Sequence, residues 1–458
     1  MFSQPRRETE YRLRWRDIYS EAELCRSALR IYTKPLFQWR KALCASVDGR
    51  TLYDFASRGL RGLDELHSSL RRERFVFRPA LALPYNFNGK HRTLYISPWE
   101  ERIVDLLLYR VLNRRLHRSF SQNTYAYRDR AFGLDTCQCR IAKFLRSAGG
   151  PIYLVKRDIA NYFGSVNHDL LLERVRLIID ETDYLFRLVE QRIAFSYSDN
   201  GRIQHARVGI PFGSAMACLL ANIYLQQLDR RLEAIPELNY FRYADDLLLM
   251  TRDRHKAIEG AQVLERLLAE LRLTCKPSHS AEMVLSRKAT SDNYFVPASH
   301  FRHLGLRFDA GGGVSLARDK QRKIQNLFRF AFRRNRRRWK KATDAYSKAR
   351  LLADVAADVI TRGVRNVAII DYYLKHVDDE QQLRLLDRWL AEEVLSLIFG
   401  GHKQSHFRRM SFTELRALGL PSLVHRRRLI LRGEIESPFF MWRKQRAART
   451  LRGTVARL

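Results

Sequence analysis

The sequence is poor in acidic residues, and it lacks both a long apolar run and a cysteine framework. Only 49 Asp and Glu residues oppose 83 Lys and Arg residues in a chain of 458, so the formal net charge is +34. A chain this basic is expected to bind a polyanion, for which nucleic acid is the first candidate and a membrane surface the second. No run of about 18 apolar residues occurs, which excludes a transmembrane helix.

The six cysteines show no spacing typical of a disulfide or zinc framework. Cys137 and Cys139 are separated by a single residue, which does not match a zinc knuckle. The first residues contain no apolar core, so we expect no signal peptide and a protein of the reducing cytoplasm. Hydrophobic residues make up 46% of the chain, which predicts a globular protein with about two to four domains.

The most informative stretch is residues 241–250, in which Asp245 and Asp246 stand between two apolar, strand-like segments. A straight strand would point the two carboxylates to opposite faces, whereas a tight hairpin turn lets both reach one place. Adjacent carboxylates repel each other unless a cation neutralises them. The pattern therefore predicts a Mg²⁺ site at a hairpin tip, and the alternative is a solvated turn between two strands.

Two upstream segments are further candidates for the functional site. Residues 151–158 form an apolar run that ends in Asp158, which can either bind a metal or cap the next helix. Residues 208–214 carry glycine or proline at alternate positions and precede a helical pattern over about 217–228. This composition favours a turn where the backbone approaches another group closely, and the alternative is an ordinary loop before a core helix.

Residues 1–75 carry apolar residues at helical spacing, and the spacing of apolar residues changes after them. Residues 75–77 and 93–96 read as strands joined by a turn. Lys90 and Arg92 at the tip of this hairpin can lie over a triphosphate or form a solvent-exposed basic turn. Arginine also ends the loop over residues 123–128, where it can grip phosphate or lie on the surface.

Residues 301–308 read as one aromatic strand, and the chain beyond residue 317 is helical and very basic. Interleaved arginine and aromatic residues suit a nucleic-acid backbone and base faces, although Phe332 and Trp339 can also pack inward as the core face of the helix. The basic residues of this predicted nucleic-acid surface are Arg333, Arg334, Arg336, Arg337, Arg338, Lys340 and Lys341. A second basic cluster occupies residues 425–428 and 442–444.

Taken together, these stretches resemble the ordered motifs of reverse transcriptases of the bacterial group II intron and retron type. The resemblance covers roughly residues 70–310. The similar segments are two fingers motifs at residues 89–92 and 125–128, the first aspartate motif at 158–163, the template-and-nucleotide loop and helix at 209–225, the catalytic hairpin at 243–246 and the primer-grip hairpin at 303–306.

The resemblance implies an α+β fold of the right-hand polymerase type, with fingers, a palm built on an antiparallel sheet, and a helical thumb. The boundaries that it implies are an N-terminal helical region at 1–75, fingers at 76–150, a palm at 151–310 with a fingers insertion at about 170–207, and a basic helical thumb and C-terminal region at 311–458.

The implied activity is RNA-directed DNA polymerisation with two Mg²⁺ ions, or Mn²⁺ in their place, roughly 4 Å apart. The implied metal ligands are Asp158, Asp245, the carbonyl of Ile159 and, as a supporting acid, Asp246. The implied nucleotide-binding residues are Lys90, Arg92, Arg128, Phe163, Phe212 and Gly213. Phe163 resembles the steric gate of the family, a bulky ring that blocks a 2′-hydroxyl and so favours deoxynucleotides.

Three departures from the family pattern stand out. Phe212 replaces the usual glutamine of the Pro-Gln-Gly loop, and His279 occupies the place of the lysine thought to protonate pyrophosphate. Lys276 is nearby, so either residue is a candidate general acid. The segments that mark the retron and intron subfamilies do not occur cleanly, which points toward the defence-associated bacterial reverse transcriptases.

Two alternatives remain open. One is a template-independent or protein-primed DNA polymerase, in which the same palm extends a side-chain hydroxyl. The other is an RNA-binding intron maturase, against which the intact Asp158, Asp245 and Asp246 argue. The expected partners are an RNA template, a DNA product, dNTPs and, as a further candidate, a dedicated non-coding RNA, with no membrane partner and the oligomeric state left open.

Overall fold

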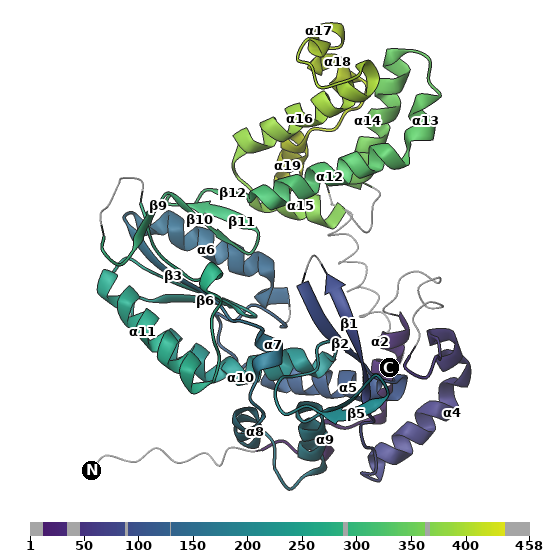
Figure 1. Ribbon diagram of the computed structural model, residues 1–458, viewed down its shortest axis with the longest axis vertical. Helices are drawn as coiled ribbons and strands as arrows, with labels where there is room; N and C mark the ends of the chain where they lie inside the picture. Colours follow the sequence, from purple (N-terminus) through teal and green to yellow (C-terminus); the bar gives the residue numbers. More distant parts are fainter. Residues whose placement is uncertain are drawn as a thin grey trace. The chain divides into compact units, whose positions relative to one another are not determined.

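The computed structural model describes residues 12–33, 46–87, 90–128, 130–286, 292–361 and 367–435. These residues form a mixed α+β fold, as predicted (Figure 1). The chain divides into two compact units, one of Met1–Cys137 with Tyr153–Met283 and the other of Gln138–Ile152 with Val284–Leu458. No helix among the described residues is both long and apolar enough to cross a membrane.

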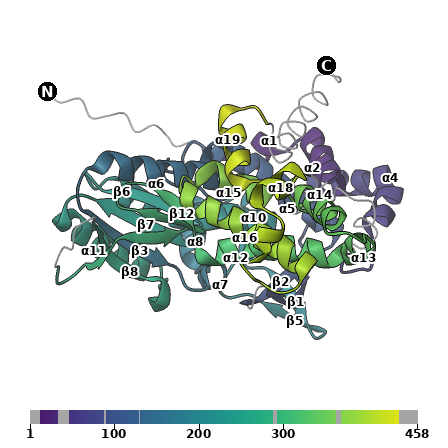
Figure 2. The same ribbon diagram turned by 90° about the horizontal axis from the view of Figure 1, so that it is seen from above.

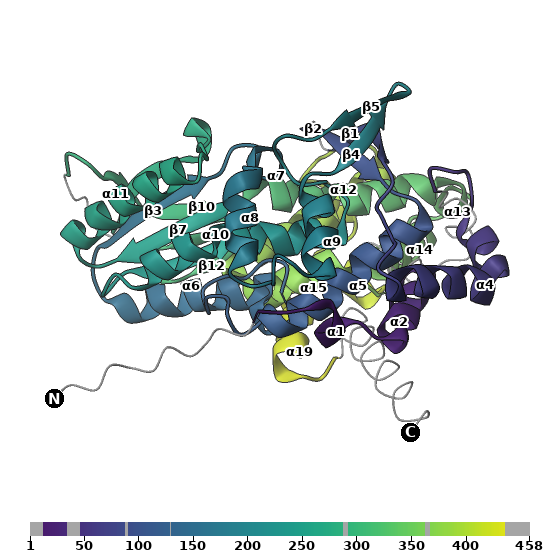
Figure 3. The same cartoon turned by 90° about the horizontal axis from the view of Figure 1, so that it is seen from below.

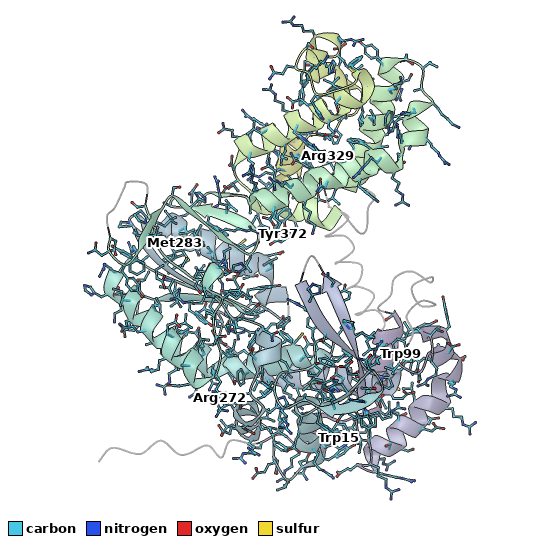
Figure 4. The ribbon with its side chains drawn as sticks, viewed as in Figure 1. Trp15, Trp99, Arg272, Met283, Arg329 and Tyr372 are labelled. Carbon is cyan, nitrogen blue, oxygen red and sulfur yellow. The ribbon has the colours of Figure 1, made fainter. Side chains whose placement is uncertain are left out.

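Helices dominate the N-terminal part of the first unit, where apolar spacing predicts them. They are α1 (Trp15–Ile18), α2 (Glu21–Thr33), α4 (Leu52–Arg71) and α5 (Trp99–Leu116), followed by the 3₁₀ turn η1 (Arg130–Phe132). Thr51 and Asp54 form a capping box that fixes the start of α4. The buried ring of Trp99 begins α5, and its Nε1 donates to the carbonyl of Arg50 at 2.9 Å (Figure 4).

A four-stranded sheet lies next along the chain, in the order β2-β1-β4-β5. Its strands are β1 (Ala80–Phe87), β2 (Lys90–Ile96), β4 (Ser196–Asp199) and β5 (Arg202–His205). Figure 3 shows the β4–β5 hairpin beside β1, with which β4 pairs in parallel. The prediction of a strand at 75–77 is wrong, because the Phe77 N–H donates to the side chain of Gln191 instead of to a neighbouring strand.

The part of the central sheet that belongs to the first unit has the order β6-β7-β3-β8 (Figure 2). Its strands are β3 (Ile152–Asp158), β6 (Asn239–Tyr243), β7 (Asp246–Thr251) and β8 (Ala281–Leu285). Every residue of β7 after Asp246 is buried, as expected for a continuous apolar run whose two faces are both covered. In the antiparallel pairing of β3 with β7, Asp158 lies directly opposite Asp246.

Helices surround this sheet and connect its strands. They are α7 (Tyr162–Ser165), α8 (His168–Arg176), α9 (Tyr184–Ile193), α10 (Ala215–Glu233), α11 (Arg254–Glu270) and the 3₁₀ turn η2 (Pro277–His279). Helix α10 contacts β6, and α11 contacts β7.

The second unit combines most of α6 (Leu134–Ala148) with short strands and a helical C-terminal part. The strands are β9 (Val296–Ala298), β10 (His300–His303), β11 (Leu306–Asp309) and β12 (Val314–Leu316), of which the last three form an antiparallel sheet. The helices are α12 (Arg318–Arg334), α13 (Arg336–Lys340), α14 (Ala345–Thr361), α15 (Val367–His376), α16 (Glu380–Phe399), α17 (His406–Arg409), α18 (Phe412–Ala417) and α19 (Leu423–Arg432).

The single strand predicted at 301–308 is instead the β10–β11 hairpin, which agrees with the hairpin that the family resemblance implies at 303–306. Leu304 and Gly305 both have positive φ, 50° and 85°. Two consecutive left-handed residues are typical of the two-residue turns that match the twist of a hairpin.

Candidate active site

The predicted hairpin turn at Asp245 and Asp246 is present. Strand β6 ends at Tyr243 and β7 begins at Asp246, so Ala244 and Asp245 make the turn. Ala244 adopts a left-handed conformation with φ of 58°, which reverses the chain within two residues. The N–H of Ile159 donates to the carbonyl of Asp245 at 3.0 Å, so the turn is tied to the end of β3.

Asp158 is the centre of a cluster of charged side chains. The N–H of Lys276 donates to the Asp158 carbonyl at 2.8 Å, and the Lys276 ammonium donates to the Asp158 carboxylate. The same ammonium lies 4.0 Å from Oδ2 of Asp245. Nδ1 of His279 lies 3.0 Å from Oδ2 of Asp158. The fold therefore brings together four residues that the sequence singled out from segments far apart in the chain.

The surroundings of Asp245 shift the pKa of its carboxyl. Burial raises the pKa of its carboxyl above the usual range, and the nearby Asp158 carboxylate raises it further. The Lys276 ammonium acts in the opposite direction because it favours the ionised form. A second positive charge at this place would relieve the remaining repulsion.

The donor atoms gathered here are those that hard divalent cations prefer, because carboxylate and carbonyl oxygens are their usual ligands. The N–H of Ile159 points to the Asp245 turn, and in a strand the carbonyl of the same residue points to the same side. Asp246 lies opposite Asp158 in the pairing of β3 with β7, and its Oδ1 is 3.9 Å from the ammonium of Lys156. Among the described residues no group of three or more His, Cys, Asp or Glu side chains is arranged to hold a metal. The oxygens are of the type that a divalent cation prefers, and the Asp158 carboxylate is bound by Lys276 and His279 instead in this structure.

Aromatic rings stand beside the carboxylates. Phe163 lies five residues after Asp158 in the chain. Its half-buried ring meets the ring of Phe212 edge-on, with the two centroids 6.1 Å apart. Gly213 has φ of 111°, and a Cβ there would come within 2.8 Å of the Leu94 side chain. Glycine therefore lets the 208–214 loop approach β2 closely, as the sequence predicts.

Arg128 is held by its own loop. Its guanidinium donates to the carbonyls of His117 at 2.7 Å, Ser121 at 2.5 Å and Thr124 at 3.1 Å. It also lies over the ring of Phe132, 3.6 Å from the centroid. These contacts give Arg128 an evident structural role, and its contact with a triphosphate stays a prediction. The side chain of Lys90 lies outside the part of the chain that the structure describes.

Residues 88–308 match the family model described as reverse transcriptase (RNA-dependent DNA polymerase). Over this segment the chain is similar to reverse transcriptases. The predicted resemblance to reverse transcriptases of the group II intron and retron type is thereby confirmed over this segment.

Curated relatives agree with this assignment. The Escherichia coli protein "Retron Ec83 reverse transcriptase" is 25% identical over 185 residues, a match that covers 39% of this chain and 55% of that protein. The Lactococcus lactis "Group II intron-encoded protein LtrA" is 24% identical over 141 residues, covering 31% of this chain and 23% of that protein. The "Uncharacterized 91 kDa protein in cob intron" of Schizosaccharomyces pombe is 26% identical over 172 residues, covering 37% and 21%. The chain thus spans between about a fifth and just over half of these relatives.

The β6–β7 hairpin is supported by a buried polar network. The Arg242 guanidinium donates to the Asp229 carboxylate at 2.6 and 2.7 Å, and neither side chain reaches solvent. Tyr240 and Thr124 donate to the same carboxylate at 2.7 and 3.1 Å. Sequence reasoning missed this network, although a lone arginine within an apolar strand and a lone aspartate within an apolar helix were visible signals.

The 208–214 loop is also anchored by a buried acid that sequence reasoning missed. The Asp105 carboxylate of α5 accepts from Ser214 Oγ at 2.6 Å and from the Ala215 N–H at 2.5 Å. Arg192 donates to it at 3.0 Å and neutralises it. The loop before α10 is therefore fixed by a carboxylate at the N-terminus of that helix.

The basic residues predicted to bind nucleic acid lie on and just after α12 and α13, and their contact with nucleic acid stays a prediction. All seven predicted basic residues are exposed, and Arg338 lies 3.9 Å from Asp354. Phe332 and Trp339 are buried, and Trp339 Nε1 donates to the Phe332 carbonyl at 3.0 Å. These two rings form the core face of the helices, so the alternative for them is confirmed and they do not reach bases.

The second basic cluster is committed to internal contacts. Arg426 pairs with the buried Asp371 at 2.7 Å, and Arg427 donates to the Val377 carbonyl at 2.6 Å. Arg428 pairs with Glu380 at 2.5 Å. Residues 442–444 lie outside the described residues. The described part of this cluster therefore holds α19 in place.

Proposed function

We propose that this protein is an RNA-directed DNA polymerase that adds dNTPs to a 3′-hydroxyl with two Mg²⁺ ions. The observation that carries the proposal is that the Lys276 ammonium reaches the carboxylates of both Asp158 and Asp245 at the β6–β7 turn, within the segment that matches the reverse transcriptase model. Reverse transcriptases as a family use divalent metal ions, and Mg²⁺ is the finer proposal, with Mn²⁺ as the alternative.

In this proposal Asp158, Asp245 and the Ile159 carbonyl hold the ions, and Asp246 supports them from β7. The ions, when bound, supply activation of the 3′-hydroxyl and neutralise charge that develops on the phosphates. Lys276 and His279 already lie against Asp158, so either can donate a proton to pyrophosphate leaving from that place.

Lys90 and Arg92 of β2 are the proposed triphosphate contacts. Arg92 is exposed, and its guanidinium lies over the ring of Phe212 in the loop that precedes α10. The Phe163 ring meets the Phe212 ring edge-on, and Phe163 is the proposed gate against the 2′-hydroxyl. In this proposal Phe163 checks the sugar and Arg92 binds the triphosphate, and both residues contact the ring of Phe212.

The proposed divisions of the chain follow its order. They are an N-terminal helical region at 1–75, fingers at 76–150, a palm at 151–310 with a fingers insertion at about 170–207, and a thumb and C-terminal region at 311–458. The proposed partners are an RNA template and a DNA product. A cytoplasmic location is part of the proposal. Membership of the antiphage defence group remains part of the proposal.

The proposal can be tested by sequencing the nucleic acid that co-purifies with the protein. We expect DNA complementary to an RNA in the same preparation, and none from an Asp245→Asn strain. RNA alone would support the maturase alternative, and DNA unrelated to any co-purified RNA would support the template-independent one.

Phe163→Ala should admit ribonucleotides, because it removes the ring proposed to meet a 2′-hydroxyl. We expect the preference for dNTP over rNTP, as a ratio of kcat/KM values, to fall roughly tenfold or more. Phe163→Tyr keeps the ring and is expected to keep the preference. An unchanged ratio in Phe163→Ala would place discrimination elsewhere.

Reversing the charge of Arg336, Arg337 and Arg338 should weaken RNA binding across all sequences. Each phosphate contact contributes a slope of about −0.9 in log K against log salt for B-form DNA and about −0.7 for single strands. We expect the salt dependence to flatten by roughly two to three units if each arginine contacts a phosphate.

The matched control for this prediction is Arg384→Glu with Arg388→Glu on α16. Both arginines are exposed and already pair with acids one turn away, Glu380 at 2.8 Å and Glu392 at 3.0 Å. The control should leave the slope largely unchanged. An unchanged slope and affinity in the triple variant would show that the α12–α13 surface is only solvated.

A further inference from the structure

Phe212, the residue that replaces glutamine, stands between two groups with different tasks. Its ring meets the Phe163 ring edge-on at 6.1 Å. The Arg92 guanidinium lies 5.0 Å from the centroid of the same ring. Edge-on ring pairs and cation–π contacts are both directional attractions, so one side chain orients two neighbours.

The backbone fixes this ring with respect to both neighbours. The carbonyl of Phe212 accepts from the Tyr95 N–H of β2 at 3.0 Å, and the Phe163 carbonyl accepts from the Ile210 N–H at 2.7 Å. At Gly209 a Cβ would come within 3.1 Å of the Gly164 backbone, so the loop lies close against the turn that carries Phe163. The 208–214 loop is therefore a rigid bridge between β2 and the gate.

A third ring completes the arrangement. Tyr127 meets Phe163 edge-on at 6.0 Å, so the gate lies between the rings of Tyr127 and Phe212. Tyr127 has φ of 62°, a left-handed conformation that costs energy in a residue with a side chain. The Tyr127 side chain is half-buried, and this burial raises the pKa of its hydroxyl.

We propose that Phe212 is a positioning residue that couples sugar selection by Phe163 to triphosphate binding by Arg92. This inference rests on the proposed function. A glutamine at 212 could form hydrogen bonds, but it offers neither a ring edge for Phe163 nor a π-face for the guanidinium. Loss of the ring should therefore affect two properties together, the affinity for nucleotide and the preference for dNTP.

The test is single-nucleotide incorporation kinetics with dNTP and rNTP on a primed RNA template. In Phe212→Leu we expect the KM for dNTP to rise and the dNTP preference to fall, each about two- to tenfold, with kcat changed less than KM. Phe212→Tyr retains the ring and should restore both values. Tyr197→Leu removes a ring of the same sheet that packs on Tyr95 at 5.2 Å, and it should change neither.

A double variant tests the coupling itself. Phe212→Leu added to Arg92→Met should raise KM little beyond Arg92→Met alone, because the guanidinium is already absent. Additive effects on KM, an unchanged KM or preference in Phe212→Leu, or no rescue by Phe212→Tyr would each overturn the inference. Thermal unfolding of each variant separates these results from loss of fold. If the wild-type protein incorporates no dNTP, the proposed function fails. If the wild-type protein is active and Phe212→Leu changes neither the KM nor the dNTP preference, only this inference is overturned.

Discussion

Asp245→Asn is expected to lower dNTP incorporation by roughly a thousandfold or more while the protein stays folded. The substitution removes one charged oxygen donor from the Asp158–Asp245 pair, which weakens the binding of a divalent cation. The fold should not suffer, because burial and Asp158 raise the pKa of the Asp245 carboxyl, so its ionised form is disfavoured in the folded state. A neutral amide relieves that repulsion, and we expect an unfolding temperature equal to or above that of the wild type.

The measurement pairs primer extension with thermal unfolding. Asp253→Asn is the matched control, because Asp253 caps α11 by accepting from the His255 N–H at 2.7 Å and asparagine caps helices as well. The control should retain activity and stability. Wild-type incorporation by Asp245→Asn would remove this residue from the chemistry.

Asp229→Ala should cause the largest loss of stability, about 3–5 kcal/mol in the free energy of unfolding. The Arg242 guanidinium has no access to solvent, and the Asp229 carboxylate accepts its hydrogen bonds at 2.6 and 2.7 Å. Removing the carboxylate leaves a buried charge without its partner. Burial strongly opposes the charged guanidinium, whereas Asp229 stabilises it.

Denaturant unfolding of the variants provides the measurement. Arg231→Ala alters an exposed residue of the same helix and should change stability by no more than about 0.5 kcal/mol. The double variant Asp229→Leu with Arg242→Met replaces the ion pair by apolar groups and should recover much of the loss. A loss below about 1 kcal/mol in Asp229→Ala would show that water or another group compensates Arg242.

This network matters to the site because it fixes the strand that leads into the catalytic turn. The Arg242 N–H donates to the Asn123 carbonyl, and the Tyr125 N–H donates to the Arg242 carbonyl, both at 2.9 Å. The loop before Arg128 is thus paired with β6. We expect Asp229→Ala to lower activity in proportion to the fraction of unfolded protein.

The sequence was sufficient for the features that depend on local pattern. The Asp245–Asp246 turn follows from two carboxylates between apolar runs, and the end of β3 at Asp158 follows from an apolar run that stops at an acid. The contact of Lys276 and His279 with Asp158 was not visible in this way, because it depends on η2 folding back on the strand.

Features that depend on tertiary contacts could not be predicted. The spacing around Arg128 looked like a phosphate grip, but its partners are carbonyls of the loop and the ring of Phe132. The rings of Phe332 and Trp339 alternate with arginine in sequence, yet helical geometry turns them toward the core. Arg426 belonged to a basic run, although its partner Asp371 lies 55 residues earlier.

The most direct test of the account is extension of a DNA primer on an RNA of defined sequence, followed by sequencing of the product. We predict DNA complementary to the RNA, dependent on a divalent cation, made from dNTPs in preference to rNTPs and absent with Asp245→Asn. Product whose sequence is independent of the RNA, or no product under any divalent cation, would contradict the account.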